Sequence, residues 1–113
     1  MIILHCLKEI TWQKVKNNSY YGERYIELEG FIHCSDLHTF YKVAPNFKDM
    51  DEKLVLLCIE SQKVEAQVKW EDGDNCGTAY PHIYGLLNIN AVERVLPYLK
   101  DDAGNWIKNE ELL

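Results

Sequence analysis

The clearest pattern in the sequence is a run of six apolar residues from Leu54 to Ile59, which contains β-branched side chains and no charge. A run of this length and kind predicts a strand covered on both faces, and we expect it at the centre of a sheet. At 68–71, apolar and charged residues alternate, which predicts a more exposed strand before a loop at 72–75. Further extended segments are predicted at 2–7, 31–34, 79–85 and 93–98.

The predicted helices are short. Thr11 can cap a helix that runs to about Lys16, with Trp12 and Val15 on one face. A second helix is expected to begin at a cap formed by Ser35 or Asp36 and to end at Pro45. Its spacing predicts a buried stripe made by Leu37, Phe40 and Tyr41.

The remaining segments carry weaker patterns. The tyrosine-rich stretch 20–28 is predicted to be irregular, and one helical turn is expected to start at Asn88 or Asn90. The tail after Asp101 is expected to be loosely held, although Trp106 can pin it. With 113 residues, of which 47% are hydrophobic, the chain predicts a single α+β domain over 1–113.

Charge narrows the classes of partner. The 18 acidic residues outnumber the 12 basic ones, which gives a net charge of −6, and Arg24 and Arg94 are the two arginines. Nucleic-acid binding draws its affinity from Lys and Arg on phosphates, so a nucleic-acid partner is not expected. The excess of acidic residues favours a small-molecule ligand, and a protein partner remains an alternative.

The start of the chain bears on localisation. Residues 1–4 are apolar, but the run is far too short for the apolar core of a signal peptide, and no stretch is long enough to span a membrane. A cytoplasmic protein that does not bind membranes is therefore expected. The four cysteines are then expected to be thiols.

Two predicted strands place a histidine opposite an apolar face. Because side chains alternate along a strand, His5 lies on the face opposite Leu4 and Cys6, and His33 shares a face with Ser35. If the strands are neighbours, the two histidines line one surface, and a helix starting at Ser35 favours an anionic ligand there. The alternative is that each histidine is half-buried and bonded to a backbone carbonyl.

The segment from Tyr80 to Gly85 forms a second candidate. It combines Tyr80, Pro81, His82 and Tyr84, which can present a flat stacking surface beside an imidazole, as a ring-bearing ligand needs. The alternative is an edge strand with ordinary core tyrosines, since proline is tolerated at an edge.

Two glutamates flank aromatic residues near these segments. Glu29 precedes Phe31 and Glu71 follows Trp70, and either carboxylate can serve a ligand if it faces the histidines. No metal site is predicted, because adjacent histidine and cysteine residues on a strand point to opposite faces; zinc held by the three histidines remains an alternative. The same geometry argues against a Cys34 nucleophile with His33 as its base.

These motifs together resemble a bacterial and plant family, domain of unknown function 952, over essentially the whole chain. The resemblance rests on Glu29-Gly30-Phe31-Ile32-His33-Cys34-Ser35, on Trp70-Glu71, on Tyr80-Pro81-His82-Ile83-Tyr84-Gly85 and on a first-strand histidine. Family members usually carry an apolar residue at the position of Cys34 and an aromatic one at Leu4, and these departures leave the histidines intact.

The family looks like a compact ADP-ribosyltransferase, which implies a split mixed or antiparallel β-sheet, short peripheral helices and a cleft for NAD as substrate. The resemblance implies that His5 holds a ribose hydroxyl. It further implies that the ligand-binding residues are His5, His33, Ser35, His82 and Tyr84, and that the catalytic candidates are Glu71, Glu29 and His33. A carboxylate can stabilise the oxocarbenium-like state at the ribose carbon, and Glu71 is the first candidate for it.

Three functions follow as hypotheses. The leading one is an ADP-ribosyltransferase-like domain that binds NAD or a related nucleotide. The second is a binding module that lacks catalysis, and the third is a protein-interaction domain with structural histidines. The related RNA 2′-phosphotransferases use arginines and histidines together, and a chain with two arginines is a poor candidate for their substrate.

Overall fold

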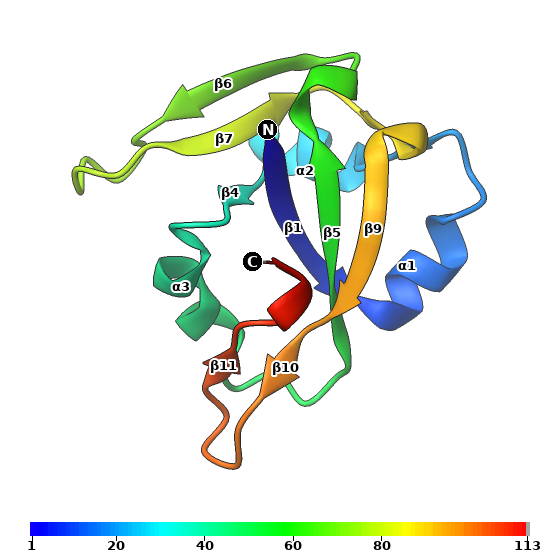
Figure 1. The fold of residues 1–113 in the computed structure, drawn as a ribbon. Helices are drawn as coiled ribbons and strands as arrows, with labels where there is room; N and C mark the ends of the chain where they lie inside the picture. The colour runs from blue at the N-terminus through cyan, green and yellow to red at the C-terminus, as the bar shows by residue number, and fades with distance from the viewer. Residues whose placement is uncertain (113) are drawn as a thin grey trace.

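The computed structural model describes residues 1–112, which fold into antiparallel sheets and a few short helices (Figure 1). The α+β class predicted from the sequence is confirmed. The main sheet has the strand order β4-β1-β5-β9 and every pairing in it is antiparallel. Its strands are β1 (Ile2–Lys8), β4 (Ser35–Asp36), β5 (Leu54–Glu60) and β9 (Val92–Pro97).

Alternation along β5 explains why both faces of this sheet are covered. Val55, Leu57 and Ile59 belong to one hydrophobic core, and Leu54, Leu56 and Cys58 belong to a second core on the other face. Strand β5 lies between β1 and β9, as its uninterrupted apolar run predicts.

A second sheet has the order β3-β7-β6, and Figure 1 shows its β6–β7 hairpin crossing one end of the main sheet. Strand β7 is central in it, so the alternative of an edge strand for this segment is wrong. The Cys34 N–H donates to the Pro81 carbonyl at 3.1 Å, so the backbone N and O of Pro81 face the β3 side of β7. They lie opposite Cys34, the residue after the end of β3, and the missing N–H of Pro81 therefore removes no hydrogen bond from the β3–β7 ladder. The strands are β3 (Ile32–His33), β6 (Gln67–Glu71) and β7 (Tyr80–Tyr84).

Two small ladders complete the strands. Strand β2 (Tyr20–Tyr21) pairs with β8 (Leu87–Asn88), and β10 (Leu99–Lys100) pairs with β11 (Trp106–Ile107). The expected loose tail is instead this hairpin and a final turn, because Trp106 packs edge-on against Phe40 with ring centroids 4.9 Å apart. Leu112 is buried in the same core.

The helices are short and lie around the sheets (Figure 1). They are α1 (Glu9–Val15), α2 (Glu23–Glu29), α3 (Phe40–Val43) and the 3-10 turns η1 (Ala44–Phe47), η2 (Ser61–Lys63), η3 (Ile89–Ala91) and η4 (Glu110–Leu112). Turn η3 confirms the helical turn expected near Asn88. In the described part of the chain, no helix is long and apolar enough to cross a membrane.

The segment 20–28, predicted to be irregular, holds most of α2. Its end carries a recognisable signal: Gly30 has φ 85° and its N–H donates to the carbonyls of Ile26 and Tyr25. Glycine tolerates this left-handed conformation, which closes a helix by satisfying its last carbonyls. The aromatic content of the stretch hid a helix of only seven residues.

Two expected helix starts also differ. Helix α1 begins at Glu9, so Thr11 lies inside it and caps nothing. Ser35 belongs to β4 and pairs with Leu4, because Asp36 begins a turn in which its Oδ1 accepts the N–H groups of His38 and Thr39. The helix N-terminus that was expected to favour an anion at Ser35 is therefore absent.

The second helix differs in two further ways. Phe40 is buried, whereas Tyr41 is 60% exposed, so the predicted stripe is only partly buried. Pro45 does not end the helical segment, since it occupies the first turn of η1, where its missing N–H is not needed.

Candidate functional site

One face of the β3-β7-β6 sheet carries most of the candidate residues. Ile32 and Ile83 point into the core, so alternation places His33, His82 and Tyr84 on the opposite face. His33 and His82 are register partners in β3 and β7, with ring centroids 5.3 Å apart. Phe31 joins them and stacks on the His82 ring at 4.1 Å.

Glu71 accepts two hydrogen bonds on this face. Its Oε1 accepts from His82 Nδ1 at 2.9 Å and from the hydroxyl of Tyr84. These two bonds, the one from Tyr84 first, hold the pKa of Glu71 below its ordinary value, so the side chain is an anion at neutral pH. The bond also fixes the tautomer: a neutral His82 that donates through Nδ1 keeps its acceptor lone pair on Nε2.

A second carboxylate and imidazole pair lies nearby. Oε2 of Glu29, the last residue of α2, lies 2.7 Å from Nε2 of His33, and both side chains are about half exposed. A salt bridge at this exposure contributes little to stability. Its effect is to orient His33 at the edge of the histidine face.

His5 has a different environment from the other two candidates. It is 3% exposed, and both ring nitrogens have protein partners: Nδ1 donates to the His33 carbonyl at 2.7 Å, and Nε2 accepts the Tyr21 hydroxyl at 3.0 Å. Burial lowers the pKa of His5 to about 4, so the ring is neutral at pH 7. The expectation that His5 offers a nitrogen to a ribose hydroxyl needs correction, because neither nitrogen is free.

These residues border one cavity of about 530 Å³, which is within the range of small-molecule sites. Of the predicted site residues, the structure places His5, His33, Ser35, Glu71 and His82 on its wall. Tyr84 does not line this cavity and is connected to it only by its hydrogen bond to Glu71. Glu29 does not line it either and is connected to it by its contact with His33. His5 and His33 do not come from paired strands, since β1 pairs with β4; the His33 carbonyl, rather than its ring, contacts His5.

The sequence reasoning missed three aromatic residues of this site. Tyr21 bonds to His5, and Tyr25 lies edge-on to the His5 ring at 5.3 Å. Phe31 stacks on His82. The density of tyrosines at 20–25 was a usable signal, but only a helix at this position brings Tyr25 toward the first strand.

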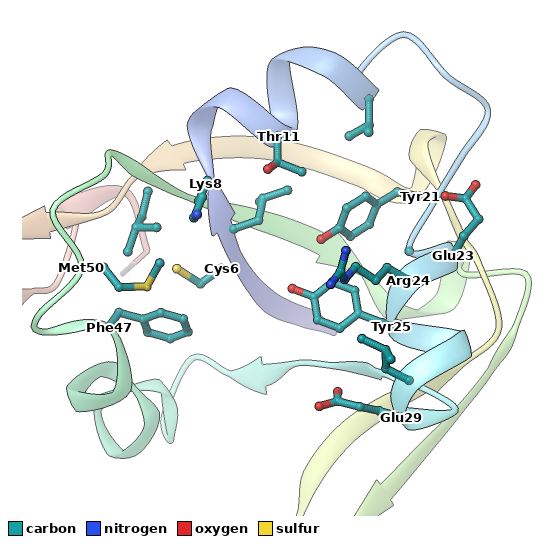
Figure 2. Close-up of a pocket in the computed structure, with 15 residues that line it drawn as sticks. Cys6, Lys8, Thr11, Tyr21, Glu23, Arg24, Tyr25, Glu29, Phe47 and Met50 are labelled. Atoms are coloured by element: carbon teal, nitrogen blue, oxygen red, sulfur yellow. The ribbon is translucent and has the colours of Figure 1, made fainter.

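A second cavity of about 640 Å³ adjoins the first (Figure 2). Cys6, Tyr25 and Phe47 line both, so they form the boundary between the two. Within residues 1–112, no three histidine, cysteine or carboxylate side chains converge on a point where they could hold a metal ion.

The fold is shared with solved structures of one bacterial protein. The crystal structure of protein CC0527 from Caulobacter crescentus has a TM-score of 0.84 and 26% identity, covering 99% of this chain and 98% of that one. A double mutant of that protein gives 0.83 and 24% with the same coverage. Its solution NMR structure gives 0.75 and 27%, covering 91% of this chain and 89% of that one.

The comparison with curated proteins found no match. A family model described as "Protein of unknown function (DUF952)" matches residues 6–95, which include the last three residues of β1, the Glu29–Ser35 motif and the whole β6–β7 hairpin. The chain therefore belongs to the DUF952 family.

Proposed function

We propose that the histidine-lined cavity binds NAD or a related nucleotide and that Glu71 is its catalytic carboxylate, as in an ADP-ribosyltransferase-like domain. The observation that carries the proposal is Glu71 itself. It is ionised, it borders the cavity, and both of its hydrogen bonds go to Oε1. Among the described residues nothing bonds to its Oε2, which is therefore available to a bound ligand.

The chemistry requires an anion at this place. In transfer of ADP-ribose, the bond between the ribose C1′ and the nicotinamide nitrogen breaks, and its electron pair returns to the nicotinamide ring. The ribose carbon then carries positive charge, which a fixed carboxylate stabilises more in the transition state than in the substrate. An acceptor hydroxyl or water attacks C1′ and loses its proton, and His82 Nε2 is the acceptor for that proton.

Other residues of the cavity fit recognition of a ring and of hydroxyls. Phe31 and Tyr80 supply aromatic surface, and Ser35 is buried on the wall with no hydrogen-bond partner for its hydroxyl within residues 1–112. His33 can accept a ligand hydroxyl through Nδ1 while Nε2 donates to Glu29. Because His5 is fully bonded, its part in this proposal is to position Tyr21 and the His33 backbone.

The two hydrogen bonds that occupy the ring nitrogens of His5 favour a second candidate function. A module that binds a small molecule or a protein without catalysis can use the cavity while His5 remains structural. The two candidates share binding residues and differ in whether Glu71 acts on the ligand.

The first experiment is an NMR titration of the full chain with NAD, following the imidazole signals. We expect saturable shifts at His33 and His82, and none at His38, which is exposed and does not line the cavity. Nicotinamide release in the same sample separates an enzyme from a binding module. The absence of shifts at millimolar NAD contradicts the proposal.

A matched pair of variants tests the role of Glu71. Glu71→Gln keeps the size of the side chain and removes its charge, so we expect nicotinamide release to fall by about 100-fold or more, with NAD still bound. Glu93→Gln is the control, since Glu93 is exposed and pairs with Lys63. Equal rates for the two variants would rule out Glu71 as the catalytic carboxylate.

A further inference from the structure

The second cavity lies beside the histidine-lined cavity, between β1, α1, α2 and the segment 47–54. Figure 2 shows Tyr21, Arg24 and Tyr25 reaching into it from the side of β2 and α2, with Phe47 and Met50 on the other side and Cys6 between them. At about 640 Å³ it is slightly larger than the histidine-lined cavity. Its size is that of a site for a small organic molecule.

The walls of this cavity are mostly apolar. Leu7, Val15 and Leu54 line it from the first strand, α1 and the start of β5, and Phe47 and Met50 close the far side. Burial raises the pKa of the Cys6 thiol to about 12, so the floor carries no negative charge at neutral pH. At the rim, Leu28 is 71% exposed, a large apolar side chain that a ligand in the cavity would cover.

One positive charge at the cavity is not neutralised. Lys8 pairs with Glu52 at 3.2 Å and Glu29 pairs with His33, whereas Arg24 makes no ion pair within residues 1–112. Figure 2 shows the Arg24 side chain extending toward the hydroxyl ends of Tyr21 and Tyr25, while the Glu23 carboxylate is directed away from them.

We propose that this cavity is a binding site for a small organic carboxylate with an apolar body, such as a medium-chain alkanoate. The carboxylate bonds to the Arg24 guanidinium, whose planar fork matches two carboxylate oxygens, with Tyr25 beside it. The apolar body lies against Val15, Phe47 and Met50, where it displaces water from apolar surface. This site shares Cys6, Tyr25 and Phe47 with the histidine-lined cavity, but Arg24 lines this site alone, and Glu71 and His82 line only the other cavity.

The test uses octanoate and the labelled methyl groups of methionine. The chain has two methionines, and Met1 is exposed at the N-terminus, so the Met50 methyl signal reports on this cavity. We expect octanoate to shift the Met50 signal saturably. Acetate, which lacks the tail, and octanol, which lacks the charge, should each bind at least about tenfold more weakly.

Variants of the full chain separate the charge from the fold. Arg24→Gln should weaken octanoate binding about tenfold or more, while Lys14→Gln, on the exposed face of α1, should leave it unchanged. An unshifted Met50 signal overturns the proposal, and so does equal binding of octanol or an unchanged affinity in Arg24→Gln. The His82 signal should stay still in this titration, so the outcome is read separately from that of NAD.

Discussion

Nδ1 of His82 lies 2.9 Å from Oε1 of Glu71, across the neighbouring strands β7 and β6. The two residues are diagonal neighbours on one face of the sheet, because the register partner of His82 is Lys69 and that of Glu71 is Tyr80. The pairing therefore depends on the register of the hairpin. A shift by one residue would move His82 to the core face and break it.

The Glu71 carboxylate should set the ionisation of Tyr84. It accepts the Tyr84 hydroxyl and raises the pKa of that phenol above its ordinary value of 10, because a phenolate beside the carboxylate loses the bond and gains repulsion. In Glu71→Gln the pKa of Tyr84 should fall toward 10. A pH titration of carbon-labelled tyrosine signals measures it, with Glu93→Gln as the control that leaves the value in place.

His5 should make the protein less stable in acid. Its pKa is about 4 in the folded chain and 6.5 as an ordinary histidine, so between these values the unfolded chain binds a proton that the folded chain does not. Above pH 6.5, neutral His5 makes its full contribution to the free energy of unfolding. This contribution falls as the pH drops toward 4, by roughly 3 kcal/mol in total. Urea unfolding at pH 7 and pH 4 measures this loss.

His5→Gln is the comparison for that experiment. Its side chain has no charge to gain, so its stability should change less between pH 7 and pH 4 than that of the wild-type chain. Identical pH dependence in the two proteins would contradict the assignment of the effect to His5.

Gly22 and Gly30, on either side of α2, should differ in their tolerance of alanine. Both have positive φ, 110° and 85°, which costs an alanine roughly 1–2 kcal/mol. A Cβ at Gly22 would in addition overlap the Ile32 side chain, whereas a Cβ at Gly30 meets no atom within 4 Å. We therefore expect Gly22→Ala to cost roughly 2–5 kcal/mol and Gly30→Ala only the smaller amount. Chemical denaturation of both variants tests the order.

The cysteines should react very unequally with a thiol reagent. Burial raises the pKa values of Cys6, Cys34 and Cys58, so these thiols are both covered and protonated. Cys76 is exposed in the loop after β6. The native protein should therefore release one equivalent of product rapidly, and the denatured protein four. Loss of the rapid phase in Cys76→Ser identifies the site.

Much of the fold follows from local patterns. The uninterrupted apolar run from Leu54 to Ile59 is sufficient to place a central strand, because only a strand covered on both faces tolerates it. The helical turn near Asn88 and the exposed strand β6 could also be predicted from the sequence. Helix α2 was not predicted, because it begins in a tyrosine-rich stretch whose pattern indicates an irregular segment.

The candidate site, like the fold, could be predicted only in part from the sequence. Motifs and strand alternation were enough to single out the candidate residues, which are the three histidines, Glu29 and Glu71. What each of these side chains contacts is known from the tertiary structure alone. It buried His5 between Tyr21 and the His33 carbonyl, and it brought His82 to Glu71. The physical reason is that a motif specifies neighbours along the chain, whereas hydrogen-bond partners and burial depend on segments that meet only after packing.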